Sequence, residues 1–319
     1  MAQNLPPCCR RIAPLLLLPL LLPGCIQIEQ TVLLNPDNSG KATIRATLTS
    51  PVAGLMQGLA QDDGKETAEA LSKQLGTGMA KAFAASMIHE STGIDAWDQV
   101  KYGPTKEGGF TFEGVAYFPD LNKLSTTSTA NAEGTPSMPQ LFNAERTSNG
   151  SWVVRGLPDQ ETGKAPPAPG KALPPDELEA KLKELRQNWE TMEAIATPML
   201  KDAKTILNLQ VAGTIRECTG WRQTSPQSAS LEIDMAAILA HLGAIMKDDA
   251  ALREALTAGR VTEDGFPQPD FTELRKFLFH GADKADLVIT PGPPLFDYAA
   301  ESAKAKAGMA DLLKELPAK

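Results

Sequence analysis

The feature that most constrains this chain is its N-terminal segment, which ends in Leu22-Pro23-Gly24-Cys25. Arg10 and Arg11 precede an apolar run over residues 12–22, and a small residue stands before the cysteine, an order typical of an export signal. The run has about eleven residues, whereas an apolar helix needs about 20 to span a bilayer. Prolines within the run also disfavour a stable helix. The sequence therefore predicts that residues 1–24 are a signal peptide that is removed and that the folded body begins at Cys25.

The same pattern resembles the signal of bacterial lipoproteins, in which the residue after the cleavage site is a lipid-modified cysteine. The resemblance implies that Cys25 receives a diacylglycerol thioether and then a further acyl chain such as palmitate, and several chains together give stable anchoring. Pro23 stands where that family usually has Ala, Ser or Thr. Ile26 in place of Asp after the cysteine implies sorting to the outer membrane of the cell envelope, facing the periplasm. The alternative is an ordinary secretory signal followed by a cysteine there by chance.

Cysteine content and charge exclude several classes of protein. Cys8 and Cys9 would leave with the signal and Cys25 would be acylated, so only Cys218 remains and no intrachain disulfide is expected. Removal of residues 1–24 takes away two arginines and no acid, which leaves 29 basic against 39 acidic residues, a net charge of −10. Nucleic-acid binding requires clustered Lys and Arg. The sequence therefore predicts no nucleic-acid partner.

The body begins with a predicted β-hairpin. Apolar residues alternate with polar ones from Ile26 to Leu34 and again from Ile44 to Leu48, on either side of Asn35-Pro36-Asp37-Asn38-Ser39-Gly40. This turn could be mistaken for the start of a calcium loop, but Leu48 occupies the twelfth position, where such a loop requires Glu. We interpret the segment as a hairpin turn. After the hairpin, Ser50-Pro51 predicts the start of a helix.

A long helix is predicted over residues 68–90, because apolar residues recur there every four positions. Its apolar stripe has two interpretations, packing across a sheet or the wall of a lipid cavity, and the first is the plainer one. The strand over residues 110–118 is the most aromatic in the chain, so we expect it to be a central strand with Phe112 and Phe118 facing the same way. Helix and strand together predict a candidate apolar groove. Its proposed lining is Leu71, Leu75, Met79, Phe83, Phe112 and Phe118.

The remaining elements alternate between strands, loops and helices. A mobile loop is expected over residues 125–139, a second hairpin over 141–155, and a Pro-rich linker over 157–175. An amphipathic helix over residues 176–200 follows, with packing on the sheet or on a partner helix as the two interpretations. Further strands are expected over 207–215 and 230–233, Asp234 is expected to cap a helix, and the chain after it is expected to be mainly helical with a brief strand at 287–289.

Several of these features together resemble the bacterial lipoprotein domain of the LppM type. They are the Cys25 anchor followed at once by the hairpin, the strand Phe112-Glu113-Gly114-Val115-Ala116-Tyr117-Phe118, and the late strand ending in Val211-Ala212-Gly213-Thr214-Ile215. That family usually has Pro-Gly in place of Ala212-Gly213 and Asp-Gly in place of Asp37-Asn38. The resemblance covers about residues 25–235. It implies an α+β sandwich with a hydrophobic groove, for which lipid or glycolipid binding in the envelope is proposed, and it implies no catalytic residue.

Motifs of known catalytic chemistry are absent from the sequence. The three histidines, His89, His241 and His280, have no metal-ligand spacing, and neither a Gly-x-Ser-x-Gly nor a Ser-x-x-Lys motif occurs. Cys218 is interpreted as a buried spectator, and the acid pairs at 62–63 and 248–249 as turns and helix caps. We therefore predict a protein that is not an enzyme and that has no metal or cofactor.

The sequence thus predicts an α+β fold with a mainly antiparallel sheet packed by long amphipathic helices. The predicted organisation is a signal peptide over residues 1–24, an α+β lipoprotein domain over 25–234, and a mainly helical C-terminal extension over 235–319. Three functional hypotheses follow: a membrane-anchored module that binds lipid or glycolipid, a structural or interaction lipoprotein with an envelope protein partner, and, least favoured, an envelope hydrolase. The first predicts an elongated apolar cavity, and the second a filled core with an exposed apolar patch.

Overall fold

We describe the fold from a computed structural model, which covers residues 25–49, 65–105, 109–125, 142–148, 150–156, 175–257 and 271–316. The predicted signal peptide, the helix start at Ser50, the mobile loop after residue 125 and most of the Pro-rich linker lie outside these residues. The described residues form six α-helices and two sheets of mainly antiparallel strands, which confirms the mixed α+β class. The chain divides into two compact units, and each is described by itself.

The larger unit contains a seven-stranded sheet and a four-stranded sheet, and it comprises residues 24–159, 204–233 and 275–319. The strand order in the larger sheet is β3-β4-β2-β1-β7-β10-β9. Their bounds are β1 Cys25–Leu34, β2 Gly40–Thr49, β3 Ala96–Pro104, β4 Phe110–Phe118, β7 Lys204–Val211, β9 Arg222–Ser225 and β10 Ser228–Asp234. The smaller sheet has the order β5-β6-β11-β8, with β5 Phe142–Arg146, β6 Trp152–Gly156, β8 Gly213–Thr219 and β11 Ala285–Pro291.

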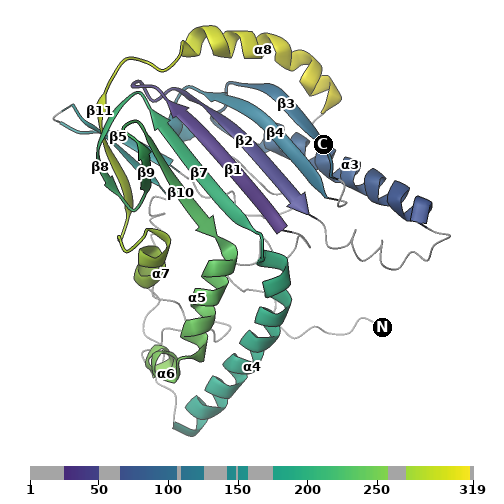
Figure 1. Ribbon diagram of the computed structural model, residues 1–319, viewed down its shortest axis with the longest axis vertical. Helices are drawn as coiled ribbons and strands as arrows, with labels where there is room; N and C mark the ends of the chain where they lie inside the picture. Colours follow the sequence, from purple (N-terminus) through teal and green to yellow (C-terminus); the bar gives the residue numbers. More distant parts are fainter. Residues whose placement is uncertain are drawn as a thin grey trace. The chain divides into compact units, whose positions relative to one another are not determined.

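The predicted first hairpin is confirmed, and it lies at the middle of the larger sheet (Figure 1). Cys25 of β1 stands opposite Thr49 of β2, and Leu34 stands opposite Gly40. The strand β4 has β2 and β3 as neighbours, so it is an inner strand, but β1 and not β4 occupies the centre of the order. The expectation that β4 is a central strand is therefore confirmed in the sense that it is not an edge strand, while the midpoint of the order falls on β1 because β7, β10 and β9 extend the sheet on the other side. The pairing of β1 with β7 is parallel.

The late strand expected over residues 207–215 is two strands that belong to different sheets. β7 ends at Val211 and β8 begins at Gly213. Gly213 has a φ of 149°, and a Cβ atom built on it would lie 2.1 Å from the carbonyl oxygen of Thr290. Only glycine fits this close approach, because any side chain would overlap that backbone oxygen. The glycine therefore marks the point at which the chain leaves one sheet for the other.

Helix α3, Lys65–Glu90, packs on one face of the larger sheet, and helix α8, Tyr298–Glu315, packs on the other. Residues in β4 alternate between these faces: Phe112 contacts Phe83 of α3, whereas Tyr117 shares a small cluster with Ala305 of α8. A short 3₁₀ helix, Leu121–Lys123, follows β4, and Asp120 caps it. The apolar core of this unit extends from the α3 face through both sheets.

The smaller unit is helical in its described part. It contains α4 Pro175–Leu200, α5 Met235–Lys247 and α6 Asp249–Thr257, while α7 Phe271–Leu278 crosses the boundary between the units. Asp234 caps α5 as predicted, since its carboxylate accepts a hydrogen bond of 3.0 Å from the amide of Ala237. The buried side chains of α4 share one core with those of α5 and α6. They include Leu182, Leu185, Trp189, Leu239, Leu242 and Leu252, so the buried face of α4 packs on partner helices, whereas the favoured interpretation placed it on the sheet.

The expectation of a mainly helical segment after residue 234 is correct for α5 to α8 and incomplete for β11. This strand pairs with β6 on one side and β8 on the other, so it lies inside the smaller sheet. It brings residues 285–291 into the same unit as the first hairpin. Local sequence shows the strand but not its partners, because pairing of distant strands depends on the whole fold.

Candidate functional site

The predicted lipidation residue, Cys25, is the first residue of β1. It is paired in register with Thr49 at the end of β2, and β2 is in turn paired with β4, where Leu48 stands opposite Phe110. Phe110 stands opposite Pro104 at the end of β3. Cys25 therefore lies at the end of the sheet at which β2 and β3 end and β4 begins. No linker separates this residue from the folded body.

The residues of the candidate groove lie together where the structure describes them. Phe83, Phe112 and Phe118 are buried, and Met79 is partly buried against the same core. The ring centroid of Phe83 lies 5.0 Å from that of Phe110 and 5.7 Å from that of Phe112, which favours close aromatic packing. Leu71 and Leu75 belong to α3, but their side chains lie outside the described residues. The groove itself stays a prediction.

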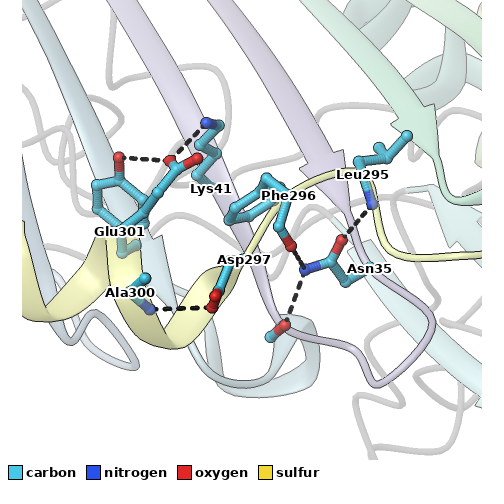
Figure 2. Close-up of polar contacts among 9 residues, drawn as sticks. Asn35, Lys41, Leu295, Phe296, Asp297, Ala300 and Glu301 are labelled. Carbon is cyan, nitrogen blue, oxygen red and sulfur yellow. Dashed lines mark hydrogen bonds and ion pairs between the residues drawn. The ribbon is translucent and has the colours of Figure 1, made fainter.

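A polar cluster that sequence analysis missed joins the first hairpin to the segment before α8 (Figure 2). Asn35 is 2% exposed, and its side-chain amide donates to the carbonyl oxygen of Phe296 at 3.2 Å and to Ser39 Oγ at 3.3 Å. Its Oδ1 accepts a hydrogen bond of 2.9 Å from the backbone amide of Leu295. The turn motif predicted a hairpin but not this contact, because its partners are about 260 residues away in the chain.

The same cluster contains an ion pair next to a tyrosine. Lys41 Nζ lies 2.7 Å from Glu301 Oε2, and the hydroxyl of Tyr117 donates to that oxygen at 3.0 Å. Lys41 Nζ also lies 4.4 Å from the ring centroid of Phe296, within cation–π range. The hydrogen bond from Lys41 is the main cause that lowers the pKa of Glu301. Burial, followed by the hydrogen bond to Glu301, raises the pKa of Tyr117 to about 12.

All three tyrosines of the chain link α8 or its flank to the sheet side of this unit. Besides the bond from Tyr117 to Glu301, Tyr298 donates to Asp95 Oδ2 at 2.9 Å, and Tyr102 donates to Glu315 Oε1 at 2.5 Å. Burial and the carboxylate raise the pKa of Tyr102 to about 12 and also raise the pKa of Tyr298. Phenols with such pKa values stay protonated at neutral pH and act as donors, so the arrangement fits a structural role better than proton transfer.

The exposed part of the α8-side face carries charges of alternating sign in one row across the strands. Lys101 stands opposite Glu113, Glu113 opposite Arg45, and Arg45 opposite Glu29. The guanidinium of Arg45 lies 3.3 Å from Glu113 and 3.9 Å from Glu29. Exposed pairs of this kind add at most about 1 kcal/mol each to stability. This row makes the exposed part of the face polar.

The residues considered for chemistry have structural partners. His89 Nε2 lies 2.6 Å from the carbonyl oxygen of Leu316, and Asp248 caps α6 through the amides of Ala250 and Ala251, as expected for a helix cap. Cys218 is half-buried with its thiol 3.3 Å from the carbonyl oxygen of Trp221, and burial raises its pKa. The thiol is therefore protonated at neutral pH and a weak nucleophile.

Among the residues that the structure describes, no group of three or more His, Cys, Asp or Glu side chains is arranged to hold a metal ion. Within the same residues, no helix combines the length and the apolar character needed to cross a membrane.

Comparisons with known proteins give one structural similarity. No family model matches the chain, and no curated protein matches it significantly. The chain is similar to the solution structure of the folded domain of LppM from Mycobacterium tuberculosis, with a TM-score of 0.27 and 10% sequence identity. The similarity covers 66% of this chain and 84% of that one. The resemblance expected from the sequence is thus present as a weak structural likeness.

Proposed function

We propose that this chain is an envelope lipoprotein that is anchored through acylated Cys25 and acts without catalysis, with lipid or glycolipid as its ligand. The observation that carries the proposal is the position of Cys25, which follows the export-type segment directly and is also the first residue of β1. Cleavage before Cys25 would leave the folded body intact from its first strand. The acyl chains would then be attached to the end of the sheet itself.

The proposed location follows from the anchor. Acyl chains on Cys25 attach the body to a membrane, and Ile26 supports the outer membrane of a Gram-negative envelope, with the body in the periplasm. The net charge of −8 gives no support to nucleic acid as a partner.

The proposed ligand site is the apolar face between α3 and β4. A mainly apolar lining with few charges suits acyl chains, and Met79, Phe83 and Phe112 are the apolar residues that would line such a site. Met79 is partly buried, so it marks the part of this surface nearest to solvent.

Labelling and mass spectrometry of the full chain test the anchor. We expect the wild-type chain, expressed in a Gram-negative host with alkyne-tagged palmitate, to be cleaved after Gly24 and labelled. Cys25→Ser should keep residues 1–24 and carry no label, because serine cannot form the thioether. Cys218→Ser is the matched control and should be labelled like the wild type. An unlabelled wild-type chain contradicts the proposal.

Native mass spectrometry of the purified, anchored chain tests the ligand, since organic extraction removes only lipid that is not covalently attached. We expect about one phospholipid or glycolipid per chain and at least a several-fold loss in Met79→Gln, which makes the groove polar at similar volume. Lys81→Gln, at an exposed position of the same helix, is the control and should retain the lipid. If the extract of the wild-type chain contains no lipid, the proposal of a lipid ligand is wrong. The proposal that Cys25 is acylated is not affected by that result.

A second candidate function is that of an interaction lipoprotein within an envelope protein complex. Two observations favour it: the tight packing of Phe83, Phe110, Phe112 and Trp97, and the exposed row of alternating charges on the other face. Crosslinking in intact envelopes distinguishes it, because a charge reversal such as Arg45→Glu should abolish a specific crosslink if that row binds a partner.

A further inference from the structure

The end of the sheet that carries Cys25 is also the end at which α3 enters. Cys25 stands opposite Thr49, and β3 ends and β4 begins at the paired residues Pro104 and Phe110. Gly76 of α3 lies directly against this end. A Cβ atom built on Gly76 would lie 2.8 Å from the carbonyl oxygen of Gly109 and 3.0 Å from Pro104 Cβ. The backbone of α3 therefore crosses the end of the sheet at Gly76.

From Gly76 the helix runs in two directions. Toward its C-terminus it passes over the apolar face, where Phe83 contacts Phe110 and then Met87 and Ile88 are buried. Toward its N-terminus it continues to Lys65, eleven residues before Gly76. At a rise of 1.5 Å per residue this segment is about 16 Å long. It projects past the strand ends, as Figure 1 shows for α3.

The anchor places this projection close to a bilayer. Cys25 is already paired in the sheet, so no flexible chain can hold the sheet away from the membrane. The headgroup layer on one side of a bilayer is about 5–8 Å thick, because the full thickness of about 40–45 Å includes an apolar core of about 30 Å. The helical segment of about 16 Å leaves the sheet at the ends of β3 and β4, at the same end of the sheet as Cys25, and it is longer than this layer is thick.

We propose that residues 65–75 of α3 contact the headgroup layer of the membrane to which Cys25 is attached. The inference rests on the proposed acylation of Cys25. The described side chains near this segment suit a polar interface, since Lys73, Gln74 and Thr77 are exposed. The segment carries Lys65 and Lys73 against Glu66 and Glu69, so it is polar without a net charge, and an ammonium group such as that of Lys73 is attracted to lipid phosphates. The contact gives the anchored body one orientation, with the start of α3 at the bilayer and the hairpin turn at Asn35 away from it.

Depth-dependent quenching of the full, acylated chain tests the contact. Gln74 and Lys81 are both exposed and lie two turns apart on one face of α3, about 10 Å along the helix axis. Each would be changed to Cys in a Cys218→Ser background and labelled with an environment-sensitive fluorophore. The proteins would be reconstituted into vesicles of phosphatidylethanolamine and phosphatidylglycerol that contain lipid with a spin label on the headgroup. Glu90→Cys, at the far end of α3, supplies the baseline.

We expect the label at residue 74 to be quenched at least threefold more strongly than the label at residue 81, with residue 90 at the level of vesicles without spin label. Equal quenching at residues 74 and 81 on a chain whose intact mass shows acylated Cys25 overturns the contact and leaves the proposed function standing. An unmodified Cys25 overturns both. Thus the mass measurement and the quenching ratio separate the two failures.

Discussion

Helices α3 and α8 cover opposite faces of the same sheet by different means. α3 contacts the sheet through apolar side chains such as Phe83, Ala84 and Met87, which belong to the main core. α8 has a small apolar cluster around Ala305, and its Met309 and Leu312 pack only partly buried against the main core, so hydrogen bonds and ion pairs form a larger share of its contacts. These include contacts between Tyr117 and Glu301, Lys41 and Glu301, Tyr102 and Glu315, and Lys306 and Asp95.

The difference shows which helix the fold depends on. Burial of an apolar side chain of the size of Phe contributes about 1.5–3 kcal/mol, whereas a net hydrogen bond contributes about 0.5–1.5 kcal/mol and partly exposed ion pairs less. We therefore expect α3 to be integral to the core and α8 to separate from the sheet at a lower free-energy cost. The two helices thus have different structural roles.

Phe83→Ala is the change expected to have the largest effect. It removes a ring that packs on Phe110 and Phe112, and a buried Phe→Ala substitution lowers the free energy of unfolding by about 3–5 kcal/mol. Urea unfolding followed by tryptophan fluorescence measures this loss. Leu313→Ala in α8, where the side chain is 39% exposed, is the control and should change the value by less than about 0.5 kcal/mol. If both substitutions changed the free energy of unfolding equally, α3 and α8 would not differ in their contribution to stability.

Two glycines of α3 form a matched pair with effects of opposite sign. A Cβ atom at Gly76 would lie 2.8 Å from the carbonyl oxygen of Gly109, whereas a Cβ atom at Gly78 meets nothing within 4 Å. We expect Gly76→Ala to destabilise the larger unit by about 1–3 kcal/mol, as overpacking does. Gly78→Ala should instead stabilise it by up to about 1 kcal/mol, the difference in helix propensity. Thermal unfolding monitored by circular dichroism measures both, and stabilisation by Gly76→Ala would show that α3 does not rest on the strand ends.

The tyrosine contacts of α8 predict a small effect confined to alkaline pH. The folded pKa of Tyr102 and Tyr117 is raised to about 12, above the ordinary value of about 10. Their contribution to stability is therefore complete below about pH 10 and is lost as the pH rises toward about 12. Phenolate absorbance should show these tyrosines titrating near pH 12 in the folded chain and near pH 10 in urea.

The variants Tyr102→Phe and Tyr117→Phe assign the titration steps to residues. Each variant should lose one of the steps near pH 12. A contrary result would be that Tyr102 and Tyr117 of the folded wild-type chain lose their protons near pH 10 while the helical circular dichroism signal persists. That result would show that the contacts between α8 and the sheet do not raise the pKa of these phenols.

Much of the local structure was predictable because it depends on neighbours in the chain. Alternation predicted β1 and β2 and the two faces of β4, and the apolar spacing predicted α3 and α4. Asp234 was recognisable as a helix cap because its acceptor acts only three residues away. Of the residues proposed to line the groove, Met79, Phe83, Phe112 and Phe118 share one core, and the groove itself stays a prediction.

The contacts that sequence reasoning missed join residues far apart in the chain. Asn35 looked like an ordinary turn residue, and its role in binding residues 295–296 has no local signal. The tyrosines gave no periodic pattern, so their shared use in holding α8 was invisible. β11 was visible as a brief strand, but its position between β6 and β8 was not.

The sequence by itself determined the predicted export segment, Cys25 as the residue after it, and most helices and strands, because each depends on residue types within a few turns of chain. Tertiary structure alone decided that β1 is the central strand, that Gly213 carries the chain between two sheets, and that α4 packs on α5 and α6. It also placed Gly76 of α3 at the same sheet end as Cys25. The physical reason is that strand pairing and helix docking reduce the exposed apolar area and the number of backbone polar groups without a hydrogen bond. Both quantities depend on the whole chain, so no local sequence pattern specifies them.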